Sequence, residues 1–154
     1  MNKTNNAKLV IIRGLPGSGK SSLAKRIRSD YPGYFIHYEN DQGLYNDSCR
    51  YEWSQGRYKV AAKKCFDNTV IALSCNVNVI VANCLLTNKS IERYAKLVPI
   101  DNLFIIEATN NFESIHGVSE KLKNDMRNRF EKLSPQLQSR KIEYDGSFHF
   151  EGIY

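Results

Sequence analysis

Three glycines followed by a lysine and two serines lie within nine residues near the start of the chain. Glycines let successive backbone amides point into one concavity, and a lysine adds a mobile positive charge beside it. A serine hydroxyl directly after that lysine is a ligand that Mg²⁺ accepts. This chemistry suits a polyphosphate anion, so we expect the nucleotide and metal to be held by Gly14, Pro16, Gly17, Ser18, Gly19, Lys20, Ser21 and Ser22.

The spacing from Gly14 to Ser21 fits G-x-x-x-x-G-K-[ST], the P-loop. It predicts binding of ATP and Mg²⁺, with Lys20 as a catalytic cation on the phosphates and Ser21 as the metal ligand. The alternative is a glycine-rich turn that only lets a strand and a helix pack closely. That alternative does not require Lys20 and Ser21 together.

The elements around this loop have the order that a P-loop needs. Lys8–Ile12 is a short β-branched run and predicts a buried strand, and Ser21–Ser29 predicts a helix that ends before Tyr31–Gly33. Three further apolar runs predict strands over Tyr34–Tyr38, Val77–Ala82 and Leu103–Ile106. Strands that alternate with helices favour an α/β fold, here a three-layer P-loop kinase fold with a mostly parallel sheet of four to five strands.

Three stretches between and after these strands have helical spacing. Small side chains recur every three or four residues from Tyr58 to Ala72, and apolar ones from Ile91 to Val98. Ser119 offers an N-cap for a helix over Glu120–Leu133. The segment Tyr144–Ile153 is either a small hairpin or an arm over the body. We expect one domain over residues 1–154, with a core over 8–133 and a tail over 134–154.

The ends of the second and third predicted strands carry polar side chains. Glu39 and Asp41 follow the second strand and Asn83 follows the third. Since the carboxyl ends of parallel strands share one edge with the glycine loop, these groups can face a phosphoryl acceptor. Asp41 is the candidate general base. Asn83 is a candidate for orienting the acceptor or Mg²⁺-bound water. The alternatives are a turn or capping carboxylate for Asp41, and a residue that merely closes the strand for Asn83.

Basic and aromatic residues alternate after the second strand. Arg57, Lys59 and Lys63 are the candidate substrate-binding cations, in a stretch that also holds Arg50, Lys64, Tyr51, Trp53 and Tyr58. Charge combined with exposed rings suits the end of a single-stranded nucleic acid, DNA or RNA. The alternative is a solvated helix face. The net charge of +6 leans toward a polyanionic partner but is equally compatible with simple solubility.

The remaining composition narrows the class of protein. With 154 residues, 42% of them hydrophobic and 25% charged, the chain resembles an ordinary soluble globular protein. Its four cysteines show no C-x-x-C pair, which argues against zinc. The polar start and the lack of an apolar window of about 18 residues lead us to expect a cytoplasmic protein without a membrane partner. The oligomeric state is left open.

Several stretches resemble the phage-type polynucleotide kinases and related small P-loop ATP-binding proteins, which have an AAA-type ATP-binding domain. The matching stretches run in the family's order over most of the chain. They are "IIRGLPGSGKSSLA" (Ile11–Ala24), "ENDQ" (Glu39–Gln42), "YEW" (Tyr51–Trp53), "AAKKC" (Ala61–Cys65), "VIVANC" (Val79–Cys84) and "SIHGVSEKLKNDMRNRFE" (Ser114–Glu131).

The resemblance implies roles for particular residues. The family's aspartate after the second strand activates a 5′-hydroxyl, and by position this is Asp41. Segments like Ser114–Glu131 lie around a lid whose arginines stabilise the transferring phosphoryl group, which makes Arg127 and Arg129 the candidate lid cations. The alternative is that both are solvated helix charges. The chain departs from the family pattern at Ala62 and Lys64, at Cys84, and before the H-G-V segment, where Glu113 and Ser114 stand in place of an arginine.

The sequence thus predicts an ATP-dependent phosphotransferase, a polynucleotide 5′-hydroxyl kinase that passes the γ-phosphate of ATP to a nucleic-acid end. A P-loop kinase for a nucleoside or another small hydroxylated metabolite is the first alternative. The second is an ATP-binding regulator without catalytic activity, which the departures from the family pattern suggest. ATP binding is unaffected by those departures, whereas the identity of the acceptor depends on them.

Overall fold

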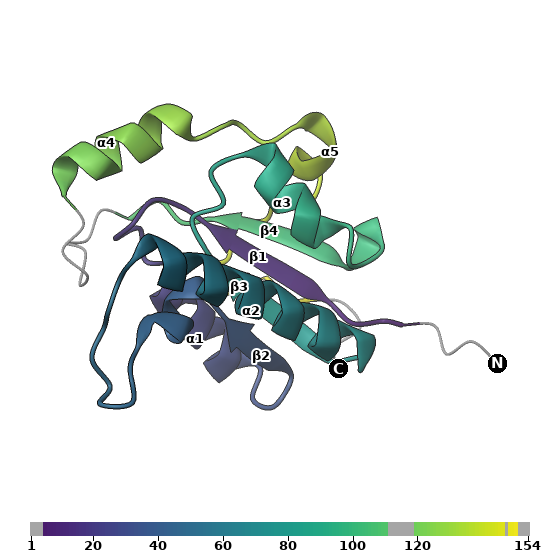
Figure 1. Cartoon of the computed structure of the whole chain (residues 1–154). Coiled ribbons are helices and arrows are strands. Elements are labelled where there is room, and N and C mark those ends of the chain that lie inside the picture. The colour runs from purple at the N-terminus through teal and green to yellow at the C-terminus, as the bar shows by residue number, and fades with distance from the viewer. Residues whose placement is uncertain (1–4, 111–118, 147, 151–154) are drawn as a thin grey trace.

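The computed structural model describes residues 5–110, 119–146 and 148–150, and its centre is a parallel β-sheet (Figure 1). The four strands lie in the order β2-β3-β1-β4. Strand β1 pairs with β3 on one side and with β4 on the other, so that Ile11 lies opposite both Val81 and Ile105. The strands span Leu9–Arg13 (β1), Phe35–Tyr38 (β2), Asn78–Ala82 (β3) and Leu103–Glu107 (β4). The predicted parallel sheet is confirmed.

Helices follow each strand and cover both faces of the sheet (Figure 1). They are α1 (Lys20–Asp30), α2 (Gln55–Ser74), α3 (Asn88–Ala95), α4 (Glu120–Arg129) and α5 (Pro135–Gln138), together with the short 3₁₀ helices η1 (Asn40–Leu44) and η2 (Ile100–Asn102).

Alternate residues of β1 enter two separate apolar cores, because side chains of a strand point to opposite faces in turn. Leu9 and Ile11 pack with residues of α2, α3 and α5, such as Leu73. Val10 and Ile12 pack with α1 and with the C-terminal tail. This arrangement of helix, sheet and helix confirms the three-layer α/β class.

The tail is an arm rather than a hairpin in the residues that the structure describes. Phe150 is 2% exposed and its ring centroid lies 5.3 Å from that of Tyr31 and 5.2 Å from that of Phe104. The backbone amide of Phe150 donates a hydrogen bond to the Tyr31 hydroxyl at 3.3 Å. Burial of aromatic rings against the α1 face therefore fixes the arm.

Helix α4 is shorter than the sequence predicts. Ser119 caps it as expected, accepting a hydrogen bond from the Leu122 amide at 3.2 Å, but the helix ends at Arg129 instead of Leu133. Phe130 leaves the helical conformation, and the Glu131 amide donates to the Leu86 carbonyl at 2.8 Å. The expected end was wrong because these tertiary contacts outweigh local helical spacing.

The side chain of Arg13 joins three segments at the end of β1. Its guanidinium is fully buried and donates to the carbonyl oxygens of Leu85, Leu86 and Glu131, each at 3.0 Å. The same group lies 3.8 Å from the centroid of the Phe130 ring and 3.5 Å from a carboxylate oxygen of Glu107. The residue before the glycine loop thus fastens the segment after β3 and the segment after α4.

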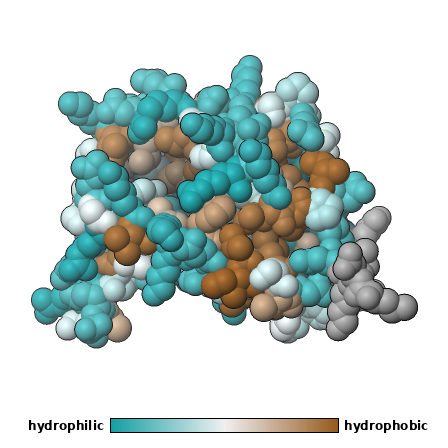
Figure 2. Space-filling model, turned by 45° about the vertical axis from the view of Figure 1, so that its right-hand side comes forward, coloured by the Kyte–Doolittle hydropathy of each residue, from teal (hydrophilic) through white to brown (hydrophobic). Residues whose placement is uncertain are grey.

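The face in Figure 2 is mostly hydrophilic, and apolar side chains gather on it in several places, the broadest near its centre. Among the described residues, Val60, Trp53 and Ile71 are each 60% or more exposed. None of the helices in the described part of the chain is both long and apolar enough to cross a bilayer.

Candidate active site

The glycine loop connects β1 to α1 at the carboxyl edge of the sheet. Strand β1 lies between β3 and β4. The next strand in the sequence, β2, lies on the far side of β3, so the strand order reverses direction at β1. Such a reversal of strand order opens a crevice at the carboxyl ends, which is where ligands bind in parallel α/β sheets. The predicted P-loop therefore lies at the position that the fold favours for a ligand.

Two glycines give the loop a conformation that other residues adopt with strain. Gly17 has φ 78° and Gly19 has φ 90°, both in the left-handed region. Gly19 is also the N-cap of α1 and provides no side-chain hydrogen bond to the helix. The first amides of α1 consequently keep their donors for an anion, in the manner of phosphate sites at helix N-termini.

Gly14 and Ser18 form the framework beneath the loop. A Cβ atom at Gly14 would meet the Ser18 Oγ at 2.5 Å and the Ala108 carbonyl oxygen at 2.7 Å. The Ser18 amide donates to the Leu15 carbonyl at 3.1 Å, and the Ser18 carbonyl accepts from the Asn110 amide at 3.2 Å. Ser18 is 4% exposed, so its side chain packs under the loop. Its predicted contact with nucleotide stays a prediction.

Lys20 bends back over the loop that precedes it. Its ammonium donates to the Leu15 carbonyl oxygen at 2.9 Å, a neutral partner that leaves the positive charge available for phosphate oxygens. Lys20 also exerts an electrostatic effect on Glu39 and contacts the thiol of Cys84 at the end of β3. The charge thus lies where the ends of β1, β2 and β3 converge.

Ser21, the predicted metal ligand, is bonded to a carboxylate. Its hydroxyl donates to Glu39 Oε2 at 2.7 Å, and the side chain of Glu39 is 19% exposed. His37 Nε2 lies 3.3 Å from the same oxygen. Burial raises the pKa of Glu39, but the contacts with His37 and Ser21 and the charge of Lys20 outweigh it and hold that pKa below the ordinary value.

Asp41 lies in the first turn of η1, directly beyond β2. The Tyr51 hydroxyl donates to Asp41 Oδ1 at 3.4 Å. Burial, the negative charge of Asp41 and this hydrogen bond raise the pKa of Tyr51 to about 12. Asp41 is therefore positioned by a neutral phenol at the same edge of the sheet as the glycine loop.

Asn83 holds η1 in place. Its Oδ1 accepts from the Asn40 amide at 2.8 Å, and its Nδ2 contacts the Cys65 sulfur at 3.6 Å. The residue is 7% exposed, so both ends of its amide are engaged inside the protein. This geometry matches the strand-closing alternative, and Asn83 positions the turn that carries Asp41.

The thiol of Cys84, directly after β3, is influenced by both predicted catalytic groups. Burial raises the pKa of its thiol, the charge of Lys20 lowers it and the charge of Asp41 raises it. Both charges therefore act on the same sulfur at the end of β3. Lys20 and Asp41 therefore both lie at the carboxyl edge of the sheet, and their joint catalytic role stays a prediction.

The predicted substrate-binding cations are not equivalent. Arg57 Nη2 lies 3.0 Å from Glu52 Oε2, and Lys63 pairs with Asp67 one helical turn later. Lys59 is exposed on α2. The aromatic partners also differ, because Trp53 is 62% exposed whereas the Tyr58 hydroxyl accepts from Asn40 Nδ2 at 3.2 Å. Two of the three cations therefore already have acidic partners.

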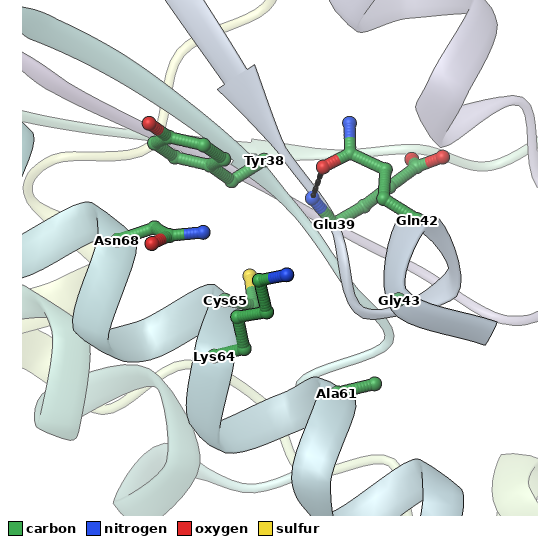
Figure 3. Close-up of a pocket in the computed structure, with 8 residues that line it drawn as sticks. All are labelled: Tyr38, Glu39, Gln42, Gly43, Ala61, Lys64, Cys65 and Asn68. Carbon is green, nitrogen blue, oxygen red and sulfur yellow. Dashed lines mark hydrogen bonds between the residues drawn. The ribbon is translucent and has the colours of Figure 1, made fainter. Parts of the chain in front are cut away.

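A cavity of about 220 Å³ lies between α2, η1 and the end of β2 (Figure 3). Figure 3 shows the Lys64 ammonium pointing into this space, whereas the Glu39 carboxylate points away from it. The cavity is lined by Tyr38, Glu39, Gln42, Gly43, Ala61, Lys64, Cys65 and Asn68. The chain departs from the family pattern at Ala62 and Lys64, and both residues lie on α2. Lys64 lines the cavity, and Ala62 follows the lining residue Ala61.

The candidate lid arginines lie at the surface. Arg127 and Arg129 are exposed in the last turn of α4, and Arg127 donates to Asn124 Oδ1. The H-G-V segment, with Glu113 and Ser114, falls in residues 111–118 and lies outside the described residues. Their action on a phosphoryl group therefore stays a prediction.

Two residues of the site were missed as functional residues. Glu39 is placed at the sheet edge by its position after β2, yet its bond to Ser21 emerges from the fold alone. Tyr51 belongs to the "YEW" stretch, which carried a resemblance but no chemical role. The lack of an acid directly after β3 is a signal that could have pointed toward Glu39.

No family model matches the chain. A 65-residue stretch is 42% identical to human NEDD4-binding protein 2 and covers 36% of this chain. The chain spans 4% of the length of that relative.

Solved structures share the fold at low sequence identity. The Pnkp1/Rnl/Hen1 complex matches with a TM-score of 0.56 and 18% identity, over 71% of this chain and 38% of that chain. Kti12 from Chaetomium thermophilum, in complex with ADP-AlF3, matches with a TM-score of 0.56 and 14% identity over 89% of each chain. An APS kinase from Mycobacterium tuberculosis matches with a TM-score of 0.51 and 14% identity, over 82% of this chain and 98% of that chain. The chain therefore has the fold of P-loop kinases.

Proposed function

We propose that the protein binds ATP with Mg²⁺ and transfers the γ-phosphoryl group to a hydroxyl. The observation that carries this proposal is that Lys20 and Ser21, at the start of α1, and Asp41, in η1, all lie at the carboxyl edge of the sheet. Left-handed glycines, uncapped α1 amides and a hydroxyl on the helix fit a nucleotide phosphate and a hard cation.

Each residue has a distinct task in this reaction. The backbone amides of the glycine loop and the Lys20 ammonium hold the phosphates of ATP. The Ser21 hydroxyl holds Mg²⁺, which when bound neutralises charge on phosphate oxygens. The Asp41 carboxylate accepts the proton of the acceptor hydroxyl, and Tyr51 keeps that carboxylate oriented.

For the acceptor we propose the 5′-hydroxyl end of a nucleic acid. Exposed rings and basic side chains follow η1 directly, and Trp53 with Lys59 offers a ring for base stacking and a cation for phosphate. Arg127 and Arg129 are proposed as lid cations.

A small hydroxylated metabolite is the second candidate acceptor. The cavity beside Glu39 has a volume of about 220 Å³ and receives the Lys64 ammonium, so it favours a small polar molecule over a polymer (Figure 3). The two candidates differ in the surface that they need, because a polymer contacts the exposed rings and Lys59, whereas a small molecule contacts Lys64.

Transfer of label from γ-labelled ATP separates the candidates. The purified protein is incubated with Mg²⁺ and with 5′-hydroxyl DNA, 5′-hydroxyl RNA or a set of nucleosides and sugars. Labelled oligonucleotide supports the first acceptor and labelled metabolite the second. ATP binding without any labelled product supports the regulator alternative and contradicts phosphotransfer.

Matched variants assign the roles. Lys20→Ala is expected to lose nucleotide affinity, whereas Asp41→Asn keeps ATP binding and loses transfer by about 10²- to 10⁴-fold. Neutralising Lys59 weakens oligonucleotide phosphorylation more than neutralising Lys63, because Lys63 already pairs with Asp67. Full activity of Asp41→Asn would show that another group is the base.

A further inference from the structure

The carboxyl edge of the sheet presents carboxylates from three different segments. Glu39 follows β2, Asp41 lies in η1 and Glu107 ends β4. P-loop NTPases hold their metal with the loop serine or threonine and an aspartate, the Walker B residue, on a neighbouring strand. Which carboxylate of this chain has that task is decided by the contacts of each.

The end of β3 provides no carboxylate. Ala82, Asn83 and Cys84 stand where the strand adjoining β1 ends, and Asn83 is engaged with Asn40. The position from which an acid reaches the loop serine in related NTPases is therefore occupied by small or neutral side chains. Strand β2, next to β3, is the nearest source of an acid on that side of the sheet.

Two of the three carboxylates are oriented toward other partners. Glu107 Oε1 lies 3.5 Å from the buried Arg13 guanidinium, on the opposite side of β1 from β3. Asp41 accepts the Tyr51 hydroxyl. Glu39 is the carboxylate that contacts Ser21, through a hydrogen bond of 2.7 Å.

The direction of that hydrogen bond is the one that a metal site needs. Because the Ser21 hydroxyl donates its hydrogen to Glu39, its lone pairs stay available for a cation. The side chain of Glu39 is 19% exposed, so its carboxylate is mostly buried beside the Ser21 hydroxyl. A hydroxyl and a carboxylate are the hard oxygen groups that Mg²⁺ accepts, directly or through its water.

We infer that Glu39, directly after β2, is the acidic residue of the Mg²⁺ site and replaces the carboxylate that β3 lacks. This inference rests on the proposed binding of ATP. In it Glu39 fixes the Ser21 hydroxyl and holds the ion or its water, and His37 Nε2 contacts the same Glu39 oxygen at 3.3 Å. The arrangement leaves Asp41 for the acceptor, so the metal and the base are separate carboxylates two residues apart.

Binding of Mn²⁺ in the presence of the non-hydrolysable analogue AMP-PNP tests the inference without any turnover. Electron paramagnetic resonance measures free Mn²⁺ while wild type and Glu39→Gln are titrated. We expect Glu39→Gln to lower Mn²⁺ affinity by about 10- to 100-fold, the loss that follows removal of a ligand's supporting partner. Affinity for AMP-PNP without metal is expected to be preserved, since Gln still accepts the Ser21 hydrogen bond.

The controls separate this inference from the proposed function. Glu143→Gln changes a carboxylate that is 83% exposed and paired with Lys141, and it keeps wild-type Mn²⁺ affinity. Ser21→Ala combined with Glu39→Gln loses less than the product of the single losses, because both act on one ion. If Glu39→Gln fails to fold, Glu39→Asp carries the test, with weakened Mn²⁺ binding expected.

The two possible failures have different signatures. Wild-type protein that binds no AMP-PNP contradicts the proposed function itself. Wild-type protein that binds AMP-PNP, together with a folded Glu39 variant whose Mn²⁺ affinity is within about twofold of wild type, overturns the role of Glu39 alone. A Glu39→Asp variant that binds Mn²⁺ with the affinity of wild type likewise overturns the role of Glu39.

Discussion

Replacing Arg13 with methionine tests whether this side chain clamps the glycine loop to the rest of the site. The guanidinium donates three hydrogen bonds to carbonyl oxygens and lies over the Phe130 ring. Hydrogen bonds of a charged donor contribute about 1.5–3 kcal/mol each, and a desolvated cation–π contact about 2 kcal/mol. The desolvation cost of the guanidinium, which lowers its pKa, offsets part of that sum.

We therefore expect Arg13→Met to lower the free energy of unfolding by about 3–5 kcal/mol, the range for breaking a buried charged pair. Urea denaturation followed by circular dichroism measures it. Arg26→Met is the matched control. Arg26 Nε lies 3.9 Å from Asp30 Oδ2 and both side chains are about half exposed, so this ion pair is expected to contribute about 1 kcal/mol or less. Arg13→Lys keeps the charge but not the planar fork, so an intermediate loss is expected.

A local measurement accompanies the global one. The Glu131 amide donates to the Leu86 carbonyl, which also accepts a hydrogen bond from the Arg13 guanidinium. Its hydrogen exchange is expected to accelerate in Arg13→Met more than that of amides in α2. An unfolding free energy for Arg13→Met equal to that of Arg26→Met, with unchanged exchange at Glu131, would refute the clamp.

Three further perturbations probe the site. Gly14→Ala places a methyl group 2.5 Å from Ser18 Oγ and 2.7 Å from the Ala108 carbonyl oxygen, so calorimetry should show weakened nucleotide binding. Gly56→Ala is the control, because a methyl group there meets open space and should leave nucleotide binding unchanged. The raised pKa of Tyr51 means that its contribution to stability is full below pH about 10 and lost as the pH rises toward 12. Urea titrations at successive pH values should therefore show a smaller loss in Tyr51→Phe than in wild type, the remainder coming from Tyr58, Tyr94 and Tyr144, whose pKa values are also raised. Alkylation followed by mass spectrometry should modify Cys84 more slowly than the exposed Cys49 and Cys75, because burial raises the pKa of Cys84, and equal rates would contradict its placement.

Local signals predicted much of the fold. The β-branched run before the glycines predicted β1, and alternation of apolar runs with helical spacing predicted a parallel sheet covered on both faces. The Ser119 cap was also correct, since capping depends on residues three positions apart. Such features follow from neighbours in the sequence, and the structure alters their ends by a few residues.

Features that join distant residues were harder to predict. The end of α4 was placed four residues too late because Phe130 is drawn out of the helix to contact Arg13. The tail could be a hairpin or an arm until aromatic contacts of Phe150 with Tyr31 decided it. Helical spacing carries no information about a partner more than a hundred positions away.

The sequence by itself determined the glycine loop, the lysine and serine that follow it, and the strand ends that place Asp41 at the same edge. The tertiary structure decided which acid meets Ser21 and which cations are already paired. Ser21 and Glu39 are 18 positions apart, and Arg13 and Glu131 are 118 apart. Contacts of this kind depend on the order of the strands, which is a property of the packed sheet rather than of any local pattern.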